Sequence, residues 1–288
     1  MISPEIIKKI KNLEIHTRKM ISGLLLGQGR SIAKGSGFDF DQIREYQSGD
    51  DVRSIDWKSS ARMDKVLIKQ YREERNQTIL LLVDISASSW YGSGAQGKYD
   101  TLSHVAAMIS LIASYHDDAV GLILFADEVQ TYIPAQKGKK HVHMLLETLF
   151  AIKPAKRQTD IKKALEYVAQ LKKKNMIVFL LSDFIDHDFT QPLQPLSKQH
   201  DVIAVSCLDQ REIELPKCGF LTVQDQETGQ EIMLNLAGSG HAKIGSFLTS
   251  RVVEQQKLFK RAGVRLLSLA AHQNNDHELI KFFRKRMT

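Results

Sequence analysis

The sequence Ile79-Leu-Leu-Leu-Val-Asp84-Ile-Ser86-Ala-Ser88 decides the fold of this chain. Its first five residues are apolar without alternation, which is typical of a strand buried on both faces in the middle of a parallel sheet. Ligands of open α/β sheets bind beyond the carboxyl ends of such strands. Asp84, Ser86 and Ser88 therefore mark the expected functional edge of the sheet. A carboxylate and two hydroxyls are hard oxygen donors, which suit Mg²⁺ or Mn²⁺.

Apolar runs of the same kind recur along the chain, and segments with helical periodicity separate them. We expect core strands at residues 119–125, 176–181, 202–208 and 264–269, an edge strand at 128–133, and helices at 98–115, 141–150, 160–171, 191–199, 239–262 and 275–286. Residues 220–224 and 231–236 flank the turn-like segment Gln226–Gly229 and predict an inserted β-hairpin. Strands that alternate with helices predict an α/β fold with a mostly parallel sheet flanked by helices.

The N-terminal quarter has a different character, so we divide the chain into an N-terminal region at residues 1–75 and an α/β domain at residues 76–288. Apolar residues on one face predict a helix at residues 4–26. A polar block at residues 37–62 has no sustained period but carries aromatic residues at intervals, which favours an ordered loop held by ion pairs. Residues 65–75 resemble an edge strand. The N-terminal region is therefore expected to be a helix and loop extension.

Composition excludes several classes of function. The 288 residues are 43% hydrophobic and 25% charged, as in ordinary globular proteins. The net charge of +7 is spread along the chain without an aromatic-rich stacking motif, so we do not expect nucleic-acid binding. Cys207 and Cys218 form no C-x-x-C pair that would indicate zinc or a disulfide framework. We see neither a secretory signal nor an apolar run long enough to span a membrane, and we expect a cytoplasmic protein without an integral membrane segment.

A second strand end adds to the candidate site. The strand at residues 176–181 ends on Ser182-Asp183, and Thr159 precedes the helix at residues 160–171. We therefore expect a divalent metal site at this edge of the sheet, made from Asp84, Ser86, Ser88, Thr159 and Asp183. An ion bound largely by hydroxyls would be under-neutralised and would take another anionic oxygen, such as a carboxylate of a partner protein. The simpler alternative is that Asp84 and Ser86 only cap the following turn.

This constellation resembles the metal-ion-dependent adhesion site of von Willebrand factor A domains, in which D-x-S-x-S is followed by Thr and Asp in later loops. The resemblance implies a von Willebrand A-like (Rossmann-like) fold. It also implies that Ser86, Ser88 and Thr159 bind the metal directly or nearly so. Asp84 and Asp183 would then act through water and hydrogen bonds.

The polar block R-E-Y-x-x-G-D-D-x-R-x-I-D-W-K-x-S-A-R resembles the signature of the bacterial domain-of-unknown-function 58 (DUF58) family. Its signature residues here, which could form a docking surface, are Arg44, Glu45, Tyr46, Gly49, Asp50, Asp51, Arg53, Asp56, Trp57, Lys58 and Arg62. Members are typically encoded beside MoxR-type AAA+ ATPases, so the resemblance implies a partner role in a chaperone or assembly system. One departure is Ser89-Trp90, where the family commonly has Met after the second Ser.

These patterns support three hypotheses. The first is a non-enzymatic protein-interaction module that depends on Mg²⁺ or Mn²⁺, with a MoxR-type ATPase or a client that presents a carboxylate as its partner. The second is a metal-dependent phosphohydrolase or nuclease, which would need a general base such as Asp160 or His187. In the third, the block Arg44–Arg62 is itself the docking surface. The pattern G-x-G-x-x-G at residues 92–97 does not directly follow its strand, which favours a turn over a dinucleotide site.

Overall fold

The computed structural model of the chain describes residues 3–26, 38–63, 65–73, 77–94, 96–153, 158–186, 189–216, 218–271, 275 and 278–282. The chain forms two compact units. One comprises residues 1–27 and 77–288, and the other comprises residues 28–76.

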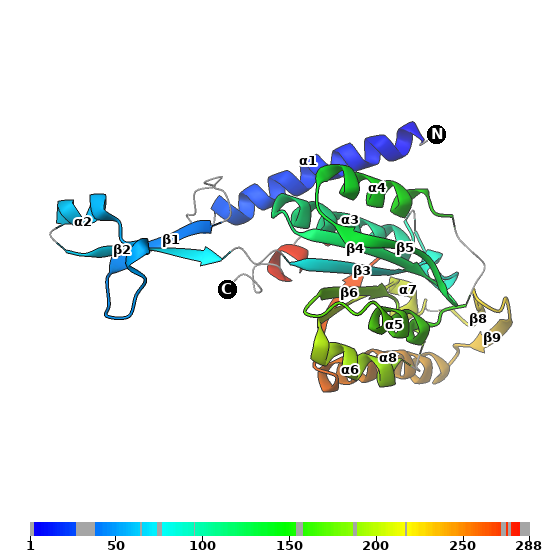
Figure 1. The fold of residues 1–288 in the computed structure, drawn as a ribbon. Helices are drawn as coiled ribbons and strands as arrows, with labels where there is room; N and C mark the ends of the chain where they lie inside the picture. The colour runs from blue at the N-terminus through cyan, green and yellow to red at the C-terminus, as the bar shows by residue number, and fades with distance from the viewer. Residues whose placement is uncertain are drawn as a thin grey trace. The chain divides into compact units, whose positions relative to one another are not determined.

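A six-stranded sheet forms the centre of the larger unit, in the order β10-β7-β6-β3-β4-β5 (Figure 1). Its strands are β3 (Thr78–Asp84), β4 (Ala119–Phe125), β5 (Val129–Gln136), β6 (Ile177–Ser182), β7 (Asp201–Leu208) and β10 (Arg265–Ala270). All neighbouring pairs are parallel except β4 and β5. Strand β3 thus lies between two parallel neighbours, as its unbroken apolar run predicts.

Helices cover both faces of this sheet, so the prediction of an α/β fold with a mostly parallel sheet flanked by helices is confirmed (Figure 1). On one face, Ile79, Leu81 and Val83 of β3 share an apolar cluster with α1, α3 and α4. On the other face, Leu80 and Leu82 share a second cluster with α5, α6 and α8. The helices are α1 (Pro4–Leu26), α3 (Lys98–Tyr115), α4 (Lys139–Ala151), α5 (Ile161–Gln170), α6 (Thr190–Gln199), α7 (Gln210–Ile213) and α8 (Gly240–Arg261). Alternate β3 residues therefore contribute to two separate cores.

Helix α1 belongs to the sheet unit, whereas we had grouped its residues with the N-terminal region 1–75. The reason is its apolar face, because Ile10, Leu13 and Met20 are buried in the cluster that also holds α3 and α4. Sequence periodicity predicts that α1 has such a face, but it does not identify the surface against which that face packs.

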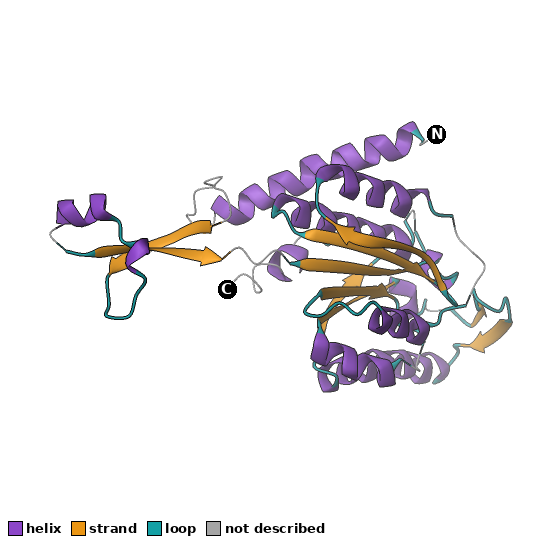
Figure 2. Cartoon of the chain, viewed as in Figure 1, coloured by secondary structure: helices purple, strands orange, loops and turns teal. Residues whose placement is uncertain are grey.

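The smaller unit contains regular structure where we expected a loop (Figure 2). Strand β1 (Phe38–Glu45) pairs antiparallel with β2 (Leu67–Glu73), and the 3₁₀-helix η1 (Val52–Ser54) and helix α2 (Trp57–Met63) lie between them in the chain. Thus β2 confirms the expected edge strand. The expectation that the polar block is a loop is wrong, because its first residues pair with β2 and Asp56 caps α2.

The inserted hairpin is confirmed as β8 (Phe220–Gln224) and β9 (Glu231–Asn235), which form a two-stranded sheet of their own. Of the closing helix expected at 275–286, residues 278–282 are helical, and the residues 276–277 and 283–286 lie outside the described part. Within the residues described, no helix combines the length and apolar character that crossing a membrane requires.

Candidate metal centre

The centre of the candidate site is Asp84, the last residue of β3, whose side chain is completely buried. Its Oδ1 accepts a hydrogen bond from the backbone N–H of Ser86 at 2.9 Å. Its Oδ2 accepts one from the hydroxyl of Ser182 at 2.6 Å, and Ser182 ends the neighbouring strand β6. Both carboxylate oxygens are therefore fixed by the two strand ends that the sequence singled out.

Two serine hydroxyls lie side by side in the loop after β3. The Oγ atoms of Ser86 and Ser88 are 3.2 Å apart, and the Oγ of Ser89 is 3.4 Å from that of Ser86. Adjacent ligands of an octahedral Mg²⁺ ion, at bond lengths of about 2.0–2.1 Å, lie about 3 Å apart. The spacing of Ser86 and Ser88 therefore suits two neighbouring ligand positions of a small hard cation.

The 3₁₀-helix η2 (Ser88–Trp90) fixes this loop at the position where the sequence departs from the family pattern. The indole N–H of Trp90 donates to the carbonyl oxygen of Ile85 at 3.3 Å, and the Trp90 ring stacks on Tyr99 of α3 with 4.2 Å between centroids. The side chain at position 90 thus packs the loop against α3 and leaves the serine hydroxyls in place.

Asp183 follows Ser182 and is paired with a lysine. Its Oδ2 accepts a hydrogen bond from Nζ of Lys98 at 2.7 Å, and its Oδ1 accepts one from the backbone N–H of Ile185 at 3.2 Å. Lys98 begins helix α3, is fully buried, and also donates to Glu212 of α7 at 2.7 Å. A buried cation therefore already neutralises part of the negative charge at this edge of the sheet.

These charges affect one another's ionisation. Burial, and then the charge of Asp183, raises the pKa of Asp84 from 3.8 to about 6, against the opposing effect of its hydrogen bonds from Ser182 and Ser86. Burial lowers the pKa of Lys98, but Asp183 and Glu212 outweigh it and raise that pKa above its usual value. Asp183 is thus paired with the cation of Lys98, whereas Asp84 forms no ion pair among the described residues.

Thr159 lies in the loop before α5 and is partly buried. Its hydroxyl donates a hydrogen bond to Oε1 of Glu227, in the turn between β8 and β9, at 2.7 Å. The backbone N–H of Asp160 donates to the carbonyl oxygen of Ala126 at 2.9 Å, and that of Ile161 donates to Asp186 at 3.1 Å. The loop is therefore held against the segments that follow β4 and β6. Its Thr159 forms a hydrogen bond with Glu227, a carboxylate that the sequence did not indicate.

The donor set fits a hard divalent ion. Among the described residues, no group of three or more His, Cys, Asp or Glu side chains could hold a metal. The candidate site instead combines hydroxyls with buried carboxylates, all oxygen donors of the kind that Mg²⁺ and Mn²⁺ prefer. The structure joins Asp84, Ser86 and Ser88 by hydrogen bonds and couples Asp84 to Asp183 by charge. Their role as ligands stays a prediction.

The comparisons with known proteins identify the family. The protein-family model described as "Protein of unknown function DUF58" matches residues 42–243 of this chain. The chain belongs to the DUF58 family. It is similar to the uncharacterized protein Rv1480 of Mycobacterium tuberculosis, with 26% identity over 286 residues that cover 98% of this chain and 90% of that protein.

Two solved structures are also similar. The hypothetical protein BatB of Bacteroides thetaiotaomicron matches with a TM-score of 0.45 and 13% identity, over 73% of this chain and 97% of BatB. Proximal thread matrix protein 1 of the mussel byssus, in a form with a zinc-occupied MIDAS motif, matches with a TM-score of 0.36 and 18% identity, over 46% of this chain and 38% of that one.

The DUF58 signature residues lie in the smaller unit, where several of them fix its turns. The guanidinium of Arg44 pairs with both carboxylate oxygens of Asp50 at 2.8 and 2.7 Å, and Gly49 between them has a φ of +110° that favours glycine. Glu45, the last residue of β1, forms an ion pair with Lys65, which lies two residues before β2. These contacts support the expectation that ion pairs order the block.

Other signature residues cap the short helices of this unit. Asp51 accepts from the backbone N–H of Arg53, and Asp56 accepts from the backbone N–H groups of Lys58 and Ser59. Tyr46 is partly buried, whereas Arg53, Trp57, Lys58 and Arg62 are exposed. Trp57 has 69% of its surface exposed.

Sequence reasoning did not identify a third buried carboxylate of this DUF58 protein, besides Asp84 and Asp183. Asp209 follows β7, is fully buried, and accepts from the backbone N–H groups of Ser93 at 2.9 Å and Arg211 at 2.9 Å. Its own backbone N–H donates to Glu212 at 2.9 Å. An acid directly after a third apolar run was a signal for Asp209. A lysine at a helix start gave no signal for Lys98, because lysine is rarely buried.

The residues considered for catalysis have other contacts. Asp160 caps α5 by accepting from the backbone N–H of Lys163 at 2.9 Å, and it forms an ion pair with the Lys163 side chain at 3.1 Å. His187 lies outside the described residues. At the end of the G-x-G-x-x-G segment, the backbone N–H of Gly97 donates to Asp100 of α3 at 3.0 Å, as expected of a turn that caps a helix.

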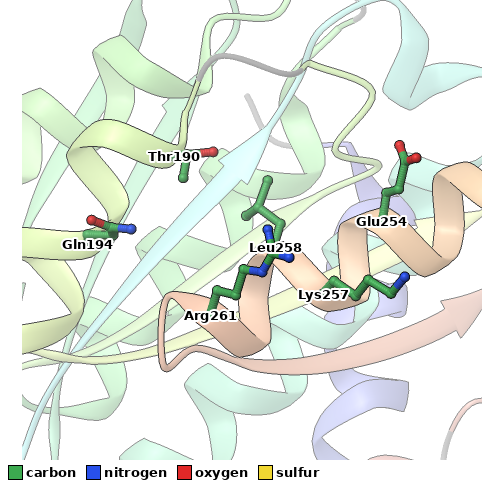
Figure 3. Close-up of a pocket in the computed structure, with 6 residues that line it drawn as sticks. All are labelled: Thr190, Gln194, Glu254, Lys257, Leu258 and Arg261. Carbon is green, nitrogen blue, oxygen red and sulfur yellow. The ribbon is translucent and has the colours of Figure 1, made fainter.

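A pocket of about 530 Å³ lies between α6 and α8 and shares no residue with the candidate metal centre (Figure 3). Its lining residues are Thr190, Gln194, Glu254, Lys257, Leu258 and Arg261. Five of these six residues are charged or polar, but the surface that they present to the pocket is mainly apolar, and we assign it no ligand.

Proposed function

We propose that this DUF58 protein is a non-enzymatic interaction module that holds Mg²⁺ or Mn²⁺ at the end of β3 and binds a protein partner through that ion. One observation carries the proposal. The hydroxyls of Ser86 and Ser88 lie 3.2 Å apart beside Asp84, a buried carboxylate without a cation of its own among its described contacts. A bound ion would supply a coordination position for a carboxylate of the partner.

The surroundings of the site favour interaction over hydrolysis. A metal-dependent hydrolase needs a base near the attacking water. The sequence candidate Asp160 is engaged in capping α5 and in an ion pair with Lys163, and Asp183 is paired with Lys98. We therefore assign catalysis to none of these residues.

The proposed partner is a MoxR-type AAA+ ATPase, or a client that presents a carboxylate. Support comes from the family signature at Arg44–Arg62, since DUF58 proteins are typically encoded beside such ATPases. Exposed Trp57 and the ordered turn at Asp50 offer a second surface for docking. In this account the metal site and the signature block act together in one assembly.

A pull-down tests the proposal with the tagged chain and a purified MoxR-type ATPase from the same organism. We expect retention of the ATPase with wild type in Mg²⁺, and loss of retention with chelator or with the double variant Ser86→Ala/Ser88→Ala. Ser246→Ala, which changes an exposed serine of α8, serves as the control and should retain the partner.

Two results would count against this mechanism. Retention that is equal with and without metal would move the docking role to the block Arg44–Arg62. Turnover of a generic phosphoester by wild type, abolished in Asp183→Ala, would favour the hydrolase instead.

A further inference from the structure

The turn between β8 and β9 reaches into the loop that carries Thr159. Within residues 222–230, Glu227 is the one residue whose side chain is not exposed. Its Oε1 accepts a hydrogen bond from the hydroxyl of Thr159 at 2.7 Å. A carboxylate from the inserted hairpin is thus held on a residue that the family resemblance assigns to the metal site.

The turn is built to present Glu227. The side chain of Asp225 accepts hydrogen bonds from the backbone N–H of Glu227 at 2.9 Å and from the hydroxyl of Thr228 at 2.7 Å. Gly229, with a φ of +72°, donates its backbone N–H to the carbonyl oxygen of Asp225 at 2.8 Å. The turn is therefore closed by its own hydrogen bonds, which leave the carboxylate of Glu227 to meet Thr159.

The hairpin formed by β8 and β9 buries little apolar surface against the rest of the protein. Strands β8 and β9 pair with each other in a separate two-stranded sheet, and large apolar side chains on them, such as Phe220 and Met233, are mostly exposed. Few buried contacts resist a movement of such a hairpin. The contact of Glu227 with Thr159 can therefore be exchanged for another at modest cost.

We propose that Glu227 is an internal ligand, which places its carboxylate on the bound divalent ion in the position that a partner's carboxylate takes in the complex. The inference rests on the function proposed above. Asp183 is already paired with Lys98, whereas the hydrogen-bond partners of Asp84 are the uncharged Ser86 and Ser182, so Asp84 is the one carboxylate of the predicted ligand set that is left to balance a divalent cation. The carboxylate of Glu227, which accepts a hydrogen bond from Thr159, would supply the further negative charge that a divalent ion needs.

The test compares two hairpin variants of the full chain. Glu227→Gln preserves the side-chain shape and can still accept from Thr159, and Glu231→Gln removes an exposed carboxylate from the same hairpin. The probe is Mn²⁺ alone, titrated by calorimetry. We expect Glu227→Gln to weaken Mn²⁺ affinity by about tenfold, in the range found for the loss of one contributing group at a metal site, and Glu231→Gln to leave it unchanged.

A second readout follows the turn itself. Hydrogen exchange of the amides of residues 225–230 should slow when Mg²⁺ is added to wild type, because the ion would hold Glu227. The effect should be absent in Glu227→Gln.

The controls separate this inference from the function on which it rests. If Ser86→Ala/Ser88→Ala loses Mn²⁺ while Glu227→Gln binds it like wild type and its turn exchanges like wild type, the inference is overturned and the proposed metal site stands. If wild type binds no Mn²⁺, both are overturned.

Discussion

Substituting Lys98 with methionine is expected to lower the free energy of unfolding by about 3–5 kcal/mol, the usual cost of removing one partner from a buried ion pair. Methionine matches the unbranched shape of lysine, so packing changes little. The loss arises because Asp183 is left buried without its cation and Glu212 loses the same partner. Urea unfolding followed by circular dichroism measures the difference.

Lys137→Met is the matched control, because Lys137 forms an ion pair with Asp117 at the surface. Its substitution should change stability by less than about 1 kcal/mol. Mg²⁺ should restore part of the stability of Lys98→Met, since an ion bound at the predicted site would compensate the charge of Asp183. Equal stabilities for the two variants would show that Lys98 does not hold this site together.

Substituting Asp84 with asparagine is expected to stabilise the metal-free protein at pH 7.5 by about 1–3 kcal/mol while weakening Mg²⁺ binding. The pKa of Asp84 is about 6 in the folded protein and near 3.8 when unfolded, so the folded state binds the proton more tightly. Its favourable contribution is complete below pH 3.8 and is lost as the pH rises through 6, at about 1.4 kcal/mol for each unit of difference. Asparagine carries no charge to bury, but it satisfies the two hydrogen bonds less well.

The neighbouring residue Asp183 provides a control for the predicted stabilisation by Asp84→Asn. Asp183→Asn should instead destabilise the protein, because it leaves Lys98 buried with Glu212 alone. Unfolding in chelator at pH 7.5 and pH 4.5 separates the cases. The gain of Asp84→Asn should shrink toward zero at pH 4.5, and a gain of equal size at both pH values would contradict the account.

The sequence predicts the core of the fold well, because β3 must be buried on both faces to accommodate five consecutive apolar residues. It does not predict the smaller unit. Strand β1 is stabilised by its pairing with β2, which lies more than twenty residues further along the chain. The periodicity of a single segment does not identify such a partner strand.

The residues of the candidate site likewise fall into those that the sequence predicts and those that it does not. Asp84 and Asp183 could be found because Asp84 directly follows one apolar run, Asp183 comes one residue after another, and the ends of neighbouring parallel strands meet at one edge. Lys98 could not, since its burial depends on Glu212 from a distant helix. Glu227 could not either, because the direction in which an inserted hairpin points is set by tertiary contacts.

The central claim is that the loop after β3 binds a divalent ion through Ser86 and Ser88. The most direct test is a calorimetric titration of Mg²⁺ into wild type, Ser86→Ala/Ser88→Ala and Ser89→Ala, a buried neighbour outside the motif. We predict one binding site in wild type and in Ser89→Ala, and none in the double variant. Undiminished binding by the double variant would contradict the account.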